Sequence, residues 1–373
     1  MIIRNAKILY GKNFDLIEGS LEIKGDKIYK IKKHAISRNK VIIIPSFINS
    51  HIHLLDAIGK ELWHNKTIDD LVRPPNSLKH KLLEEPLAKI KSAANSAIKE
   101  MIMGGITFYC EFSNSPRISV DMLKNSGIGG KILYEPVDVM NDNEVHENTM
   151  NKGFLNNILE VSAECDGVGI SGVCEFSDKV LQNLAQFSDY LALHVAEHRI
   201  SQVRSLKQTK KTEVERVVRL KPKFLVHLTN PIKNDLELIA NHRIPIICCP
   251  RANAVLNVGL PPIKELLRRK ILVALGTDNV MLNSPDIFKE LEFTAKIAKL
   301  PSKEVLKLAT INPAKIFNLN KGIIEEGRDA DLIVLRMLEN VQYSYDIISS
   351  IVHRADQRNV WKVYCKGKEV YSK

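Results

Sequence analysis

Two histidines that lie two residues apart are the first candidates for chemistry in this sequence. His51 and His53 follow the apolar run 41–47, which predicts a buried strand. On extended backbone, residues i and i+2 point to the same side, so both imidazoles can face one point. Two neutral imidazoles that converge can bind a metal ion. The pair alone is equally compatible with two polar residues that end a strand.

Other side chains able to bind a metal follow apolar runs further along the chain. His194, His227 and Asp278 each end such a run, and Glu197 comes three residues after His194. Taken singly, a histidine can simply end a strand, and Asp278 can cap a helix. In a parallel barrel, however, the carboxyl ends of all strands meet at one face. Three histidines and a carboxylate there would form a metal site with an open position for water.

The middle of the chain alternates apolar runs with helical periodicity, which predicts βα units. The amphipathic stretch 87–103 is one such helix, with apolar residues on a single face. Eight strands are predicted at 41–47, 106–110, 131–135, 168–173, 190–194, 224–227, 245–249 and 272–276. Eight parallel strands with intervening helices predict an α/β protein with a closed (β/α)8 TIM barrel. The alternative is an open doubly wound sheet, but no Gly-x-Gly-x-x-Gly follows an early strand.

The two ends of the chain differ from the middle. Short alternating runs with glycines between them fill the first 40 residues and return in the last 50. A few short strands cannot bury much apolar surface alone, so we predict that both ends pair into one small β domain. The segment 57–83 does not fit the alternation and directly follows the histidine pair. We therefore predict that it is a lid over the catalytic face.

Composition narrows the classes of function. The 45% hydrophobic and 26% charged residues are ordinary for a soluble globular protein. No apolar run of about 18 residues is present, which argues against a transmembrane helix. The six cysteines are scattered in apolar runs and predict reduced thiols in a cytoplasmic protein. The net charge of +11 comes from dispersed Lys and Arg, which favours solvated faces over nucleic-acid binding.

Taken together, the motifs resemble those of the amidohydrolase superfamily, specifically its cytosine deaminase, guanine deaminase and chlorohydrolase branch. The matching segments are Pro45 to His53, His194 to Glu197, Val226-His227, Cys249-Pro-Arg-Ala-Asn253, Gly276-Thr-Asp278 and residues 322–331. The resemblance implies a metal-dependent (β/α)8 barrel and a small β-sandwich built from both chain ends. We place the β-sandwich domain at 1–44 and 322–373, and the barrel at 45–321.

The resemblance also implies roles for individual residues. The implied ligands of one divalent metal are His51, His53, His194 and Asp278. The metal is expected to be Zn²⁺, with Fe²⁺ as the alternative. Glu197 would protonate a ring nitrogen, while His227 and Asp278 would accept or orient the proton of the activated water. Members with two metals carry a modified lysine after the fourth strand, and residues 169–175 contain no lysine, so one metal is expected.

We therefore expect a hydrolase of non-peptide carbon–nitrogen bonds, namely an aminohydrolase (deaminase) of a small nitrogen heterocycle. A cyclic amidohydrolase or a chlorohydrolase acting on a similar ring is the enzymatic alternative, because the same activated water would serve it. A non-catalytic scaffold of the same fold is the other alternative, although none of the implied ligands is missing. No nucleic-acid or membrane partner is expected, and a homo-oligomer remains an option.

A further set of side chains could contact a substrate. Glu111, Glu135 and Glu175 follow the second, third and fourth predicted strands and could line the mouth of the site. In the lid segment, the basic residues that could bind an acidic group are Arg73, Lys79 and His80. All of these are equally compatible with ordinary solvated charges.

Overall fold

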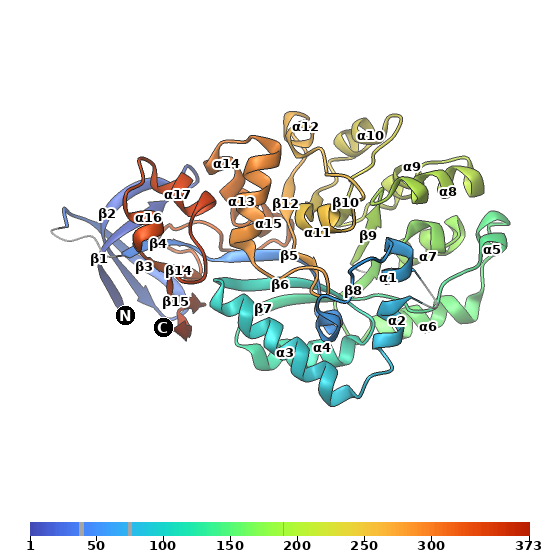
Figure 1. Cartoon of the computed structure of the whole chain (residues 1–373), viewed down its shortest axis with the longest axis horizontal. Coiled ribbons are helices and arrows are strands. Elements are labelled where there is room, and N and C mark those ends of the chain that lie inside the picture. Colours follow the sequence, from blue (N-terminus) through green and yellow to red (C-terminus); the bar gives the residue numbers. More distant parts are fainter. Residues whose placement is uncertain (37–40, 74–76, 189) are drawn as a thin grey trace.

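A parallel sheet of nine strands curls through the centre of the computed structural model, which describes residues 1–36, 41–73, 77–188 and 190–373 (Figure 1). In chain order the strands are β5 (Phe47–His53), β6 (Ile106–Ser113), β7 (Gly129–Tyr134), β8 (Gly167–Ile170), β9 (Leu191–Val195), β10 (Phe224–His227), β11 (Ile246–Cys248), β12 (Val273–Leu275) and β13 (Asp278–Asn279). Their order in the sheet is β12-β11-β10-β9-β8-β7-β6-β5-β13. The α/β class is confirmed, and the curled sheet fits the predicted TIM barrel.

The last strand region connects both edges of this sheet. The backbone N–H of Gly276 donates to the carbonyl of Cys248 at 3.0 Å, and the next N–H, of Thr277, donates to the carbonyl of His51 at 3.1 Å. Position 276 requires a glycine, because an added Cβ would lie 2.8 Å from the Cβ and the backbone nitrogen of His51. The first and last barrel strands are therefore held in close contact beside His51.

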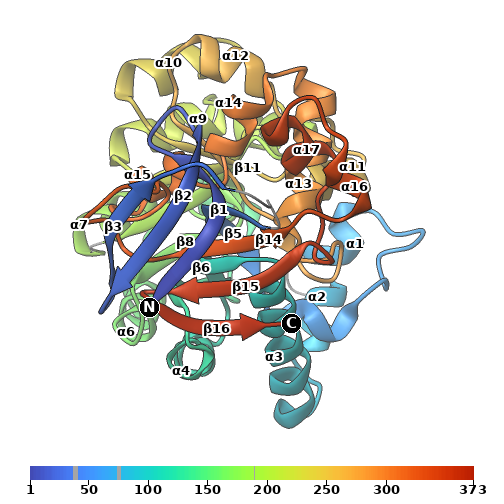
Figure 2. The same cartoon turned by 90° about the vertical axis from the view of Figure 1, so that its left-hand side faces the viewer.

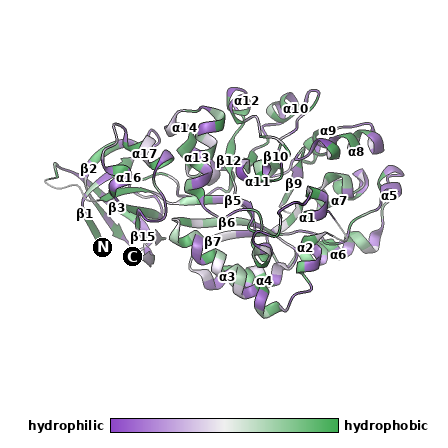
Figure 3. Ribbon diagram, in the orientation of Figure 1, coloured by the Kyte–Doolittle hydropathy of each residue, from purple (hydrophilic) through white to green (hydrophobic). Residues whose placement is uncertain are grey.

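Amphipathic helices cover the outside of the barrel sheet. The longest, α3 (Leu87–Met103), buries Ile90, Ala94 and Ala97 on one stripe, as the sequence predicted. Figure 3 shows the same pattern in the surrounding helices, whose turns alternate between hydrophobic and hydrophilic colours. The other helices of four or more residues are α1 (Ile68–Val72), α2 (Leu78–Leu82), α4 (Pro116–Ser126), α5 (Asp142–His146), α6 (Lys152–Ser162), α7 (Asp178–Phe187), α8 (Arg199–Thr209), α9 (Glu213–Val217), α10 (Asp235–His242), α11 (Pro250–Val255), α12 (Ile263–Arg268), α13 (Ile287–Ala298), α14 (Ser302–Lys307), α15 (Ile311–Ile316), α16 (Glu339–Gln342), α17 (Ile347–His353) and the 3₁₀ helix η1 (Leu55–Gly59).

A second sheet of seven strands combines the two ends of the chain (Figure 2). Its strands are β1 (Ile2–Tyr10), β2 (Asp15–Lys24), β3 (Lys27–Lys33), β4 (Val41–Pro45), β14 (Leu332–Arg336), β15 (Val360–Cys365) and β16 (Lys368–Ser372), in the order β16-β15-β14-β4-β1-β2-β3. The strand β4 joins the two groups, since it pairs in parallel with β1 and antiparallel with β14. The chain ends thus share one sheet, whereas a separate β-sandwich domain with boundaries at 44/45 and 321/322 stays a prediction.

The prediction that residues 41–47 form the first barrel strand was wrong. Val41–Pro45 belongs to the seven-stranded sheet, and the barrel strand begins at Phe47. The change of sheet occurs at one peptide, because the N–H of Ser46 donates to the carbonyl of Asp331 and the N–H of Phe47 donates to that of Gly105. Every residue of β4 is buried, so an unbroken apolar run fits a covered strand in either sheet.

A buried ion pair joins the two sheets. Lys321 contacts Asp331 at 2.5 Å and also donates to the hydroxyl of Thr107 on β6 at 3.1 Å. The second oxygen of Asp331 accepts the backbone N–H of Lys366 at 3.0 Å. We call Lys321 and Asp331 the Lys321–Asp331 pair.

Across the described part of the chain, no helix is both long enough and apolar enough to cross a membrane.

Candidate metal centre

Three histidines and an aspartate converge at one face of the barrel, where the histidines lie near the carboxyl ends of their strands and Asp278 follows β12 as the first residue of β13. His51 comes from β5, His194 from β9, His227 from β10 and Asp278 from β13. One nitrogen or oxygen atom of each lies within 4.8 Å of those of the other three, and all four residues are buried. We call these four residues the histidine cluster. The Nε2 atoms of His51 and His194 are 3.0 Å apart, and Nε2 of His51 is 3.4 Å from an oxygen of Asp278.

The donor set of the histidine cluster fits a divalent metal ion such as Zn²⁺. Nδ1 of His194 lies 3.0 Å from the carbonyl of Ile170. Because a carbonyl only accepts, this nitrogen carries the proton, and Nε2 presents its lone pair to the cluster. Nδ1 of His51 is buried and has no hydrogen-bond partner among the described residues. The cluster thus combines imidazole nitrogens that face each other with a carboxylate, which a cation between them would satisfy.

Burial and the neighbouring groups together set the protonation states of the histidine cluster. It lowers the pKa of His51 to about 4 and the pKa of His194 well below its usual value, so both imidazoles are neutral at pH 7. Burial alone would raise the pKa of Asp278, but the hydrogen bond from His51 and the neighbouring histidines outweigh it and lower that pKa. Neutral imidazoles and an ionised carboxylate are the forms that bind a metal.

His53, the remaining predicted ligand, lies beside the histidine cluster. Its Nε2 is 3.6 Å from an oxygen of Asp278, and its ring stacks on that of His194 with 5.7 Å between the centroids. Its Nδ1 lies 3.1 Å from the carbonyl of Phe112 and 3.2 Å from an oxygen of Glu135. Both partners accept hydrogen bonds, so Nδ1 carries a proton and Nε2 faces Asp278. That His53 binds the metal and His227 does not stays a prediction.

Glu197 lies next to the histidine cluster, as the sequence predicted for a proton-transfer group. It follows β9, and one of its oxygens is 3.6 Å from Nε2 of His227. Burial raises the pKa of Glu197, an effect that the nearby His227 opposes. A carboxyl with a raised pKa beside a candidate metal site is a candidate proton-transfer group. Its catalytic role stays a prediction.

Strained backbone gathers at the same strand ends. Ala196, His227, Leu228 and Asp278 have φ angles of +49°, +73°, +50° and +61°. Residues other than glycine rarely adopt this left-handed region, and where they do, the surrounding structure must hold them there. Two of these residues belong to the histidine cluster, and Ala196 directly precedes Glu197. Part of the left-handed backbone of the chain therefore lies where the candidate chemistry is.

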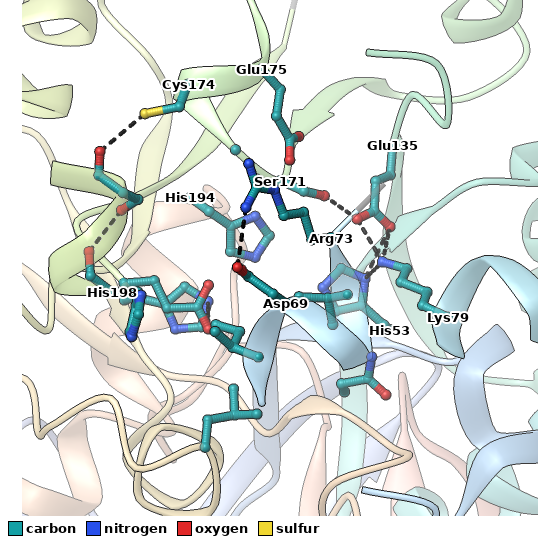
Figure 4. Close-up of a pocket in the computed structure, with 18 of the residues that line it drawn as sticks. His53, Asp69, Arg73, Lys79, Glu135, Ser171, Cys174, Glu175, His194 and His198 are labelled. Atoms are coloured by element: carbon teal, nitrogen blue, oxygen red, sulfur yellow. Dashed lines mark hydrogen bonds and ion pairs between the residues drawn. The ribbon is translucent and has the colours of Figure 1, made fainter. Parts of the chain in front are cut away.

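A cavity of about 160 Å³ opens over the histidine cluster (Figure 4). Its lining includes the candidate residues His53, His194, Glu197, His227 and Asp278. From the predicted lid segment it also includes Ile68, Asp69, Val72, Arg73, Lys79 and His80. The described residues 68–73 and 79–80 of the segment thus contribute to the wall of the site, which agrees with the predicted position over the catalytic face. That the segment opens and closes stays a prediction.

The charged residues singled out in the sequence have different surroundings. Lys79 is 7% exposed and donates to both oxygens of Glu135 at 2.6 and 2.7 Å, while Arg73 pairs with Asp69 at 3.1 Å (Figure 4). Lys79 is thus matched inside the protein, whereas Arg73 and Asp69 form an exposed pair on the surface, as an ordinary solvated charge would. Glu135 and Glu175 line the cavity as predicted, and burial raises the pKa of Glu175 to about 7. Glu111 is buried on β6 and does not line it.

Sequence reasoning missed Glu213, which lines the cavity and is 2% exposed. The available signal was Thr212 with Glu215 three positions later, a capping box that marks the start of a helix. That signal places Glu213 in the first turn of a helix. It says nothing about the strand end that this turn contacts.

Comparison with known proteins agrees with this geometry. The model of the amidohydrolase family matches residues 42–370. An uncharacterized protein of Methanocaldococcus jannaschii is 35% identical over 382 residues, which cover 96% of each chain. A 5-methylthioadenosine/S-adenosylhomocysteine deaminase of Thermococcus sibiricus is 26% identical, with 99% of this chain and 93% of the deaminase covered. The zinc complex of atrazine chlorohydrolase from Arthrobacter aurescens has a similar fold, with a TM-score of 0.83 at 18% identity and coverage of 99% and 94%.

Proposed function

The chain belongs to the amidohydrolase family, and on this premise we propose that it is a zinc-dependent aminohydrolase of a nitrogen heterocycle. The observation that carries the proposal is the buried histidine cluster at the base of the cavity, with Glu197 beside it. The family and its deaminase members establish a hydrolase of carbon–nitrogen bonds. Zinc as the metal and deamination of a particular ring are the additional steps that we propose.

The chemistry follows from the groups around the cavity. A divalent cation held by His51, His53, His194 and Asp278 would supply a water of lowered pKa. Asp278 is ionised and can accept a proton from that water. Glu197, whose pKa is raised, can hold a proton and deliver it to a ring nitrogen. The proton that Asp278 takes from the water can pass to the departing amine, and the hydroxyl left on the ring carbon can return a proton to Glu197. His227, 3.6 Å from Glu197, can orient the attacking water.

For the substrate, we propose a purine nucleoside with a substituent on its sugar. The Thermococcus sibiricus relative bears the name of a deaminase of 5-methylthioadenosine and S-adenosylhomocysteine. The cavity lining supports a ligand of mixed polarity, because apolar Val72, Ile200 and Leu256 lie there together with Arg73 and Arg204. A ring stripped of its substituent would leave part of this lining without contacts.

Ammonia release tests the proposal. Zinc-loaded protein is incubated with 5-methylthioadenosine, S-adenosylhomocysteine, guanine and cytosine, with chelator-treated protein and Glu197→Gln as controls. We expect ammonia from an adenine nucleoside with the loaded wild type only. Chloride from a chlorotriazine, or ring opening of a cyclic amide, in place of ammonia would replace deamination by the corresponding alternative. A fully folded protein that binds no divalent metal would contradict the proposal as a whole.

We infer further that the protein works in the cytoplasm on a small molecule. Five of its six free cysteines are buried, which suits a reducing compartment. A homo-oligomeric state stays a prediction, which light scattering of the purified protein would decide.

A further inference from the structure

Ala196, the residue before Glu197, has a disfavoured backbone conformation. Ala196 is fully buried and has a φ of +49°, which brings the Cβ of an L-residue close to a carbonyl oxygen. The strand β9 ends at Val195, so Ala196 turns the chain out of the sheet before Glu197. The direction in which Glu197 leaves the barrel therefore depends on the backbone angles of Ala196.

Glu213 holds the N–H of this strained residue. Its Oε2 accepts the backbone N–H of Ala196 at 2.6 Å and the hydroxyl of Ser201 at 3.2 Å. Its Oε1 accepts the thiol of Cys174 at 3.2 Å. Cys174 lies on the same side of the cavity as His198, opposite Lys79 and Glu135 (Figure 4). A hydrogen bond from an N–H to a carboxylate is among the stronger ones, and here it is shielded from water.

The backbone carbonyl groups of Ala196 and Glu197 are also held by hydrogen bonds. The backbone N–H of Asn230 donates to the carbonyl of Ala196 at 2.7 Å, and its side-chain amide donates to the carbonyl of Glu197 at 2.8 Å. Asn230 comes three residues after His227, so the loop that follows β10 holds the loop that follows β9. With Glu213 on one side and Asn230 on the other, residues 196 and 197 have little freedom to rotate.

Glu213 is itself fixed from several directions. It is the first residue of α9, and Thr212 before it caps the helix. Its backbone N–H donates to Oε1 of Gln202 on α8 at 3.1 Å, and the amide of Gln202 donates to the carbonyl of Asn230 at 3.2 Å. Gln202 and Thr212 are fully buried. The carboxylate of Glu213, at the start of α9, is thus held in a fixed position beside the backbone N–H of Ala196.

We propose that Glu213 is a positioning residue for the reaction, which holds Ala196 in its left-handed conformation and thereby aims Glu197 at the cavity and at His227. The inference rests on the proposed function for its kinetic consequence. Its structural part, that the φ angle of Ala196 depends on the Glu213 carboxylate, does not depend on which substrate is turned over. Glu213 need not touch the substrate, and acts through one backbone N–H.

Rescue by glycine tests the proposal. Glu213→Ala removes the acceptor, and we expect kcat for deamination of 5-methylthioadenosine to fall by roughly 10-fold, the cost of holding an unsupported alanine left-handed. KM and zinc content should stay near the wild-type values. Adding Ala196→Gly should restore most of kcat, because glycine adopts this φ without a supporting bond. Ala192→Gly, within β9, is the matched control and should restore nothing.

Two conservative variants keep the test decisive if Glu213→Ala does not fold. Glu213→Gln retains an oxygen acceptor and should keep kcat within about twofold of wild type. Glu213→Asp retains the charge but is shorter by one methylene, so it should lose the bond to Ala196 and show a lower kcat that Ala196→Gly restores. An unchanged kcat in Glu213→Asp, or a lowered kcat that Ala196→Gly does not raise, would overturn the proposal.

Crystal structures separate this inference from the proposed function. In Glu213→Asp we expect Ala196 to leave the left-handed region and Glu197 to turn away from His227. In the double variant that combines Glu213→Asp with Ala196→Gly, the backbone at residues 196 and 197 should keep its wild-type conformation. If no substrate of the panel is turned over while these shifts are seen, the proposed function fails and the positioning role stands. An unchanged Ala196 in Glu213→Asp would overturn the positioning role even if the protein is a deaminase.

Discussion

Two buried polar groupings in this molecule differ in whether their atoms are satisfied within the protein. In the Lys321–Asp331 pair, the ammonium donates to a carboxylate and a hydroxyl, and the second carboxylate oxygen accepts a backbone N–H. In the histidine cluster, the Nε2 atoms of His51 and His194 face each other at 3.0 Å, and Nδ1 of His51 has no partner among the described residues. One grouping is complete and the other is not.

The difference shows how a structural pair can be told from a binding site. Burying a charged or polar group is costly unless its hydrogen-bonding capacity is used, and the Lys321–Asp331 pair uses it. In the histidine cluster this capacity is not fully used, and two of its residues, His227 and Asp278, also have left-handed backbone angles. An incomplete set of donors that converges on one point marks a place for a ligand, whereas a complete set joins elements of the fold.

Breaking the histidine cluster should have the largest effect. His51→Ala and Asp278→Asn each remove a ligand atom, so we expect loss of bound zinc and a fall in kcat/KM of roughly 10³-fold or more. The barrel should stay folded, because the helices and strands that form it are unchanged. Zinc content by mass spectrometry and the circular dichroism spectrum measure the two effects. Full turnover in either variant would refute the ligand assignment.

Glu197→Gln separates binding of the metal from turnover. The amide cannot carry the proton, so kcat should fall by roughly 10²- to 10⁴-fold while zinc content stays at the wild-type level. Ammonia release and metal analysis on the same preparation give both values. If kcat is retained, another group moves the proton, and Glu197 loses the role assigned to it.

Substitutions of His53 and His227 test which of these two histidines binds the metal. We expect His53→Ala to lower zinc affinity by about 10- to 100-fold or more, and His227→Ala to keep the metal while kcat falls. Competition with a chromogenic chelator measures the affinities. The reverse pattern would make His227 the ligand and His53 the supporting residue.

Breaking the complete pair should affect stability and leave the metal in place. Lys321→Met leaves Asp331 buried without its cation, which should lower the free energy of unfolding by about 3–5 kcal/mol. Adding Asp331→Asn removes the second charge and should recover much of the loss. Urea denaturation of the zinc-loaded variants measures this. A lowered zinc content in the folded Lys321→Met variant would show that the pair is more than structural.

Lowering the pH should reduce the stability of the metal-free protein through His51 of the histidine cluster. The pKa of His51 is about 4 in the folded chain, against an ordinary value of 6.5. Between these pH values the unfolded chain binds more protons than the folded one, so the stability of chelator-treated protein should fall as pH drops through this window. The His51 contribution is up to about 3 kcal/mol, and urea denaturation at pH 7, 5.5 and 4.5 measures it. His51→Ala removes this contribution and is the control.

The sequence predicted the strand ends of the site well and their surroundings less well. His194, His227 and Asp278 follow apolar runs, and the rule that parallel strands end at one face was enough to bring them together. The sheet to which residues 41–47 belong was not predictable, because an all-buried strand has the same pattern in either sheet. The orientation of His53 depends on the carbonyl of Phe112, which is distant in sequence.

The charges around the cavity illustrate the same limit. Lys79 and Glu135 form a buried pair across 56 positions of the chain, and local composition cannot show such a partnership. Glu213 on α9 accepts the N–H of Ala196, a loop residue whose left-handed φ angle no local pattern predicted. Sequence periodicity predicts which way a strand faces, whereas these contacts depend on how separate loops meet.

The contact between the first and last barrel strands at Gly276 has a consequence for the order in which the site can form. His51 is made early by the ribosome and Asp278 late, and the two meet only when the last barrel strand settles beside the first. The complete set of His51, His194, His227 and Asp278 can therefore form only in a polypeptide that extends past residue 278 and whose last barrel strand has paired with the first. A product that ends before Asp278 would lack the carboxylate of the site.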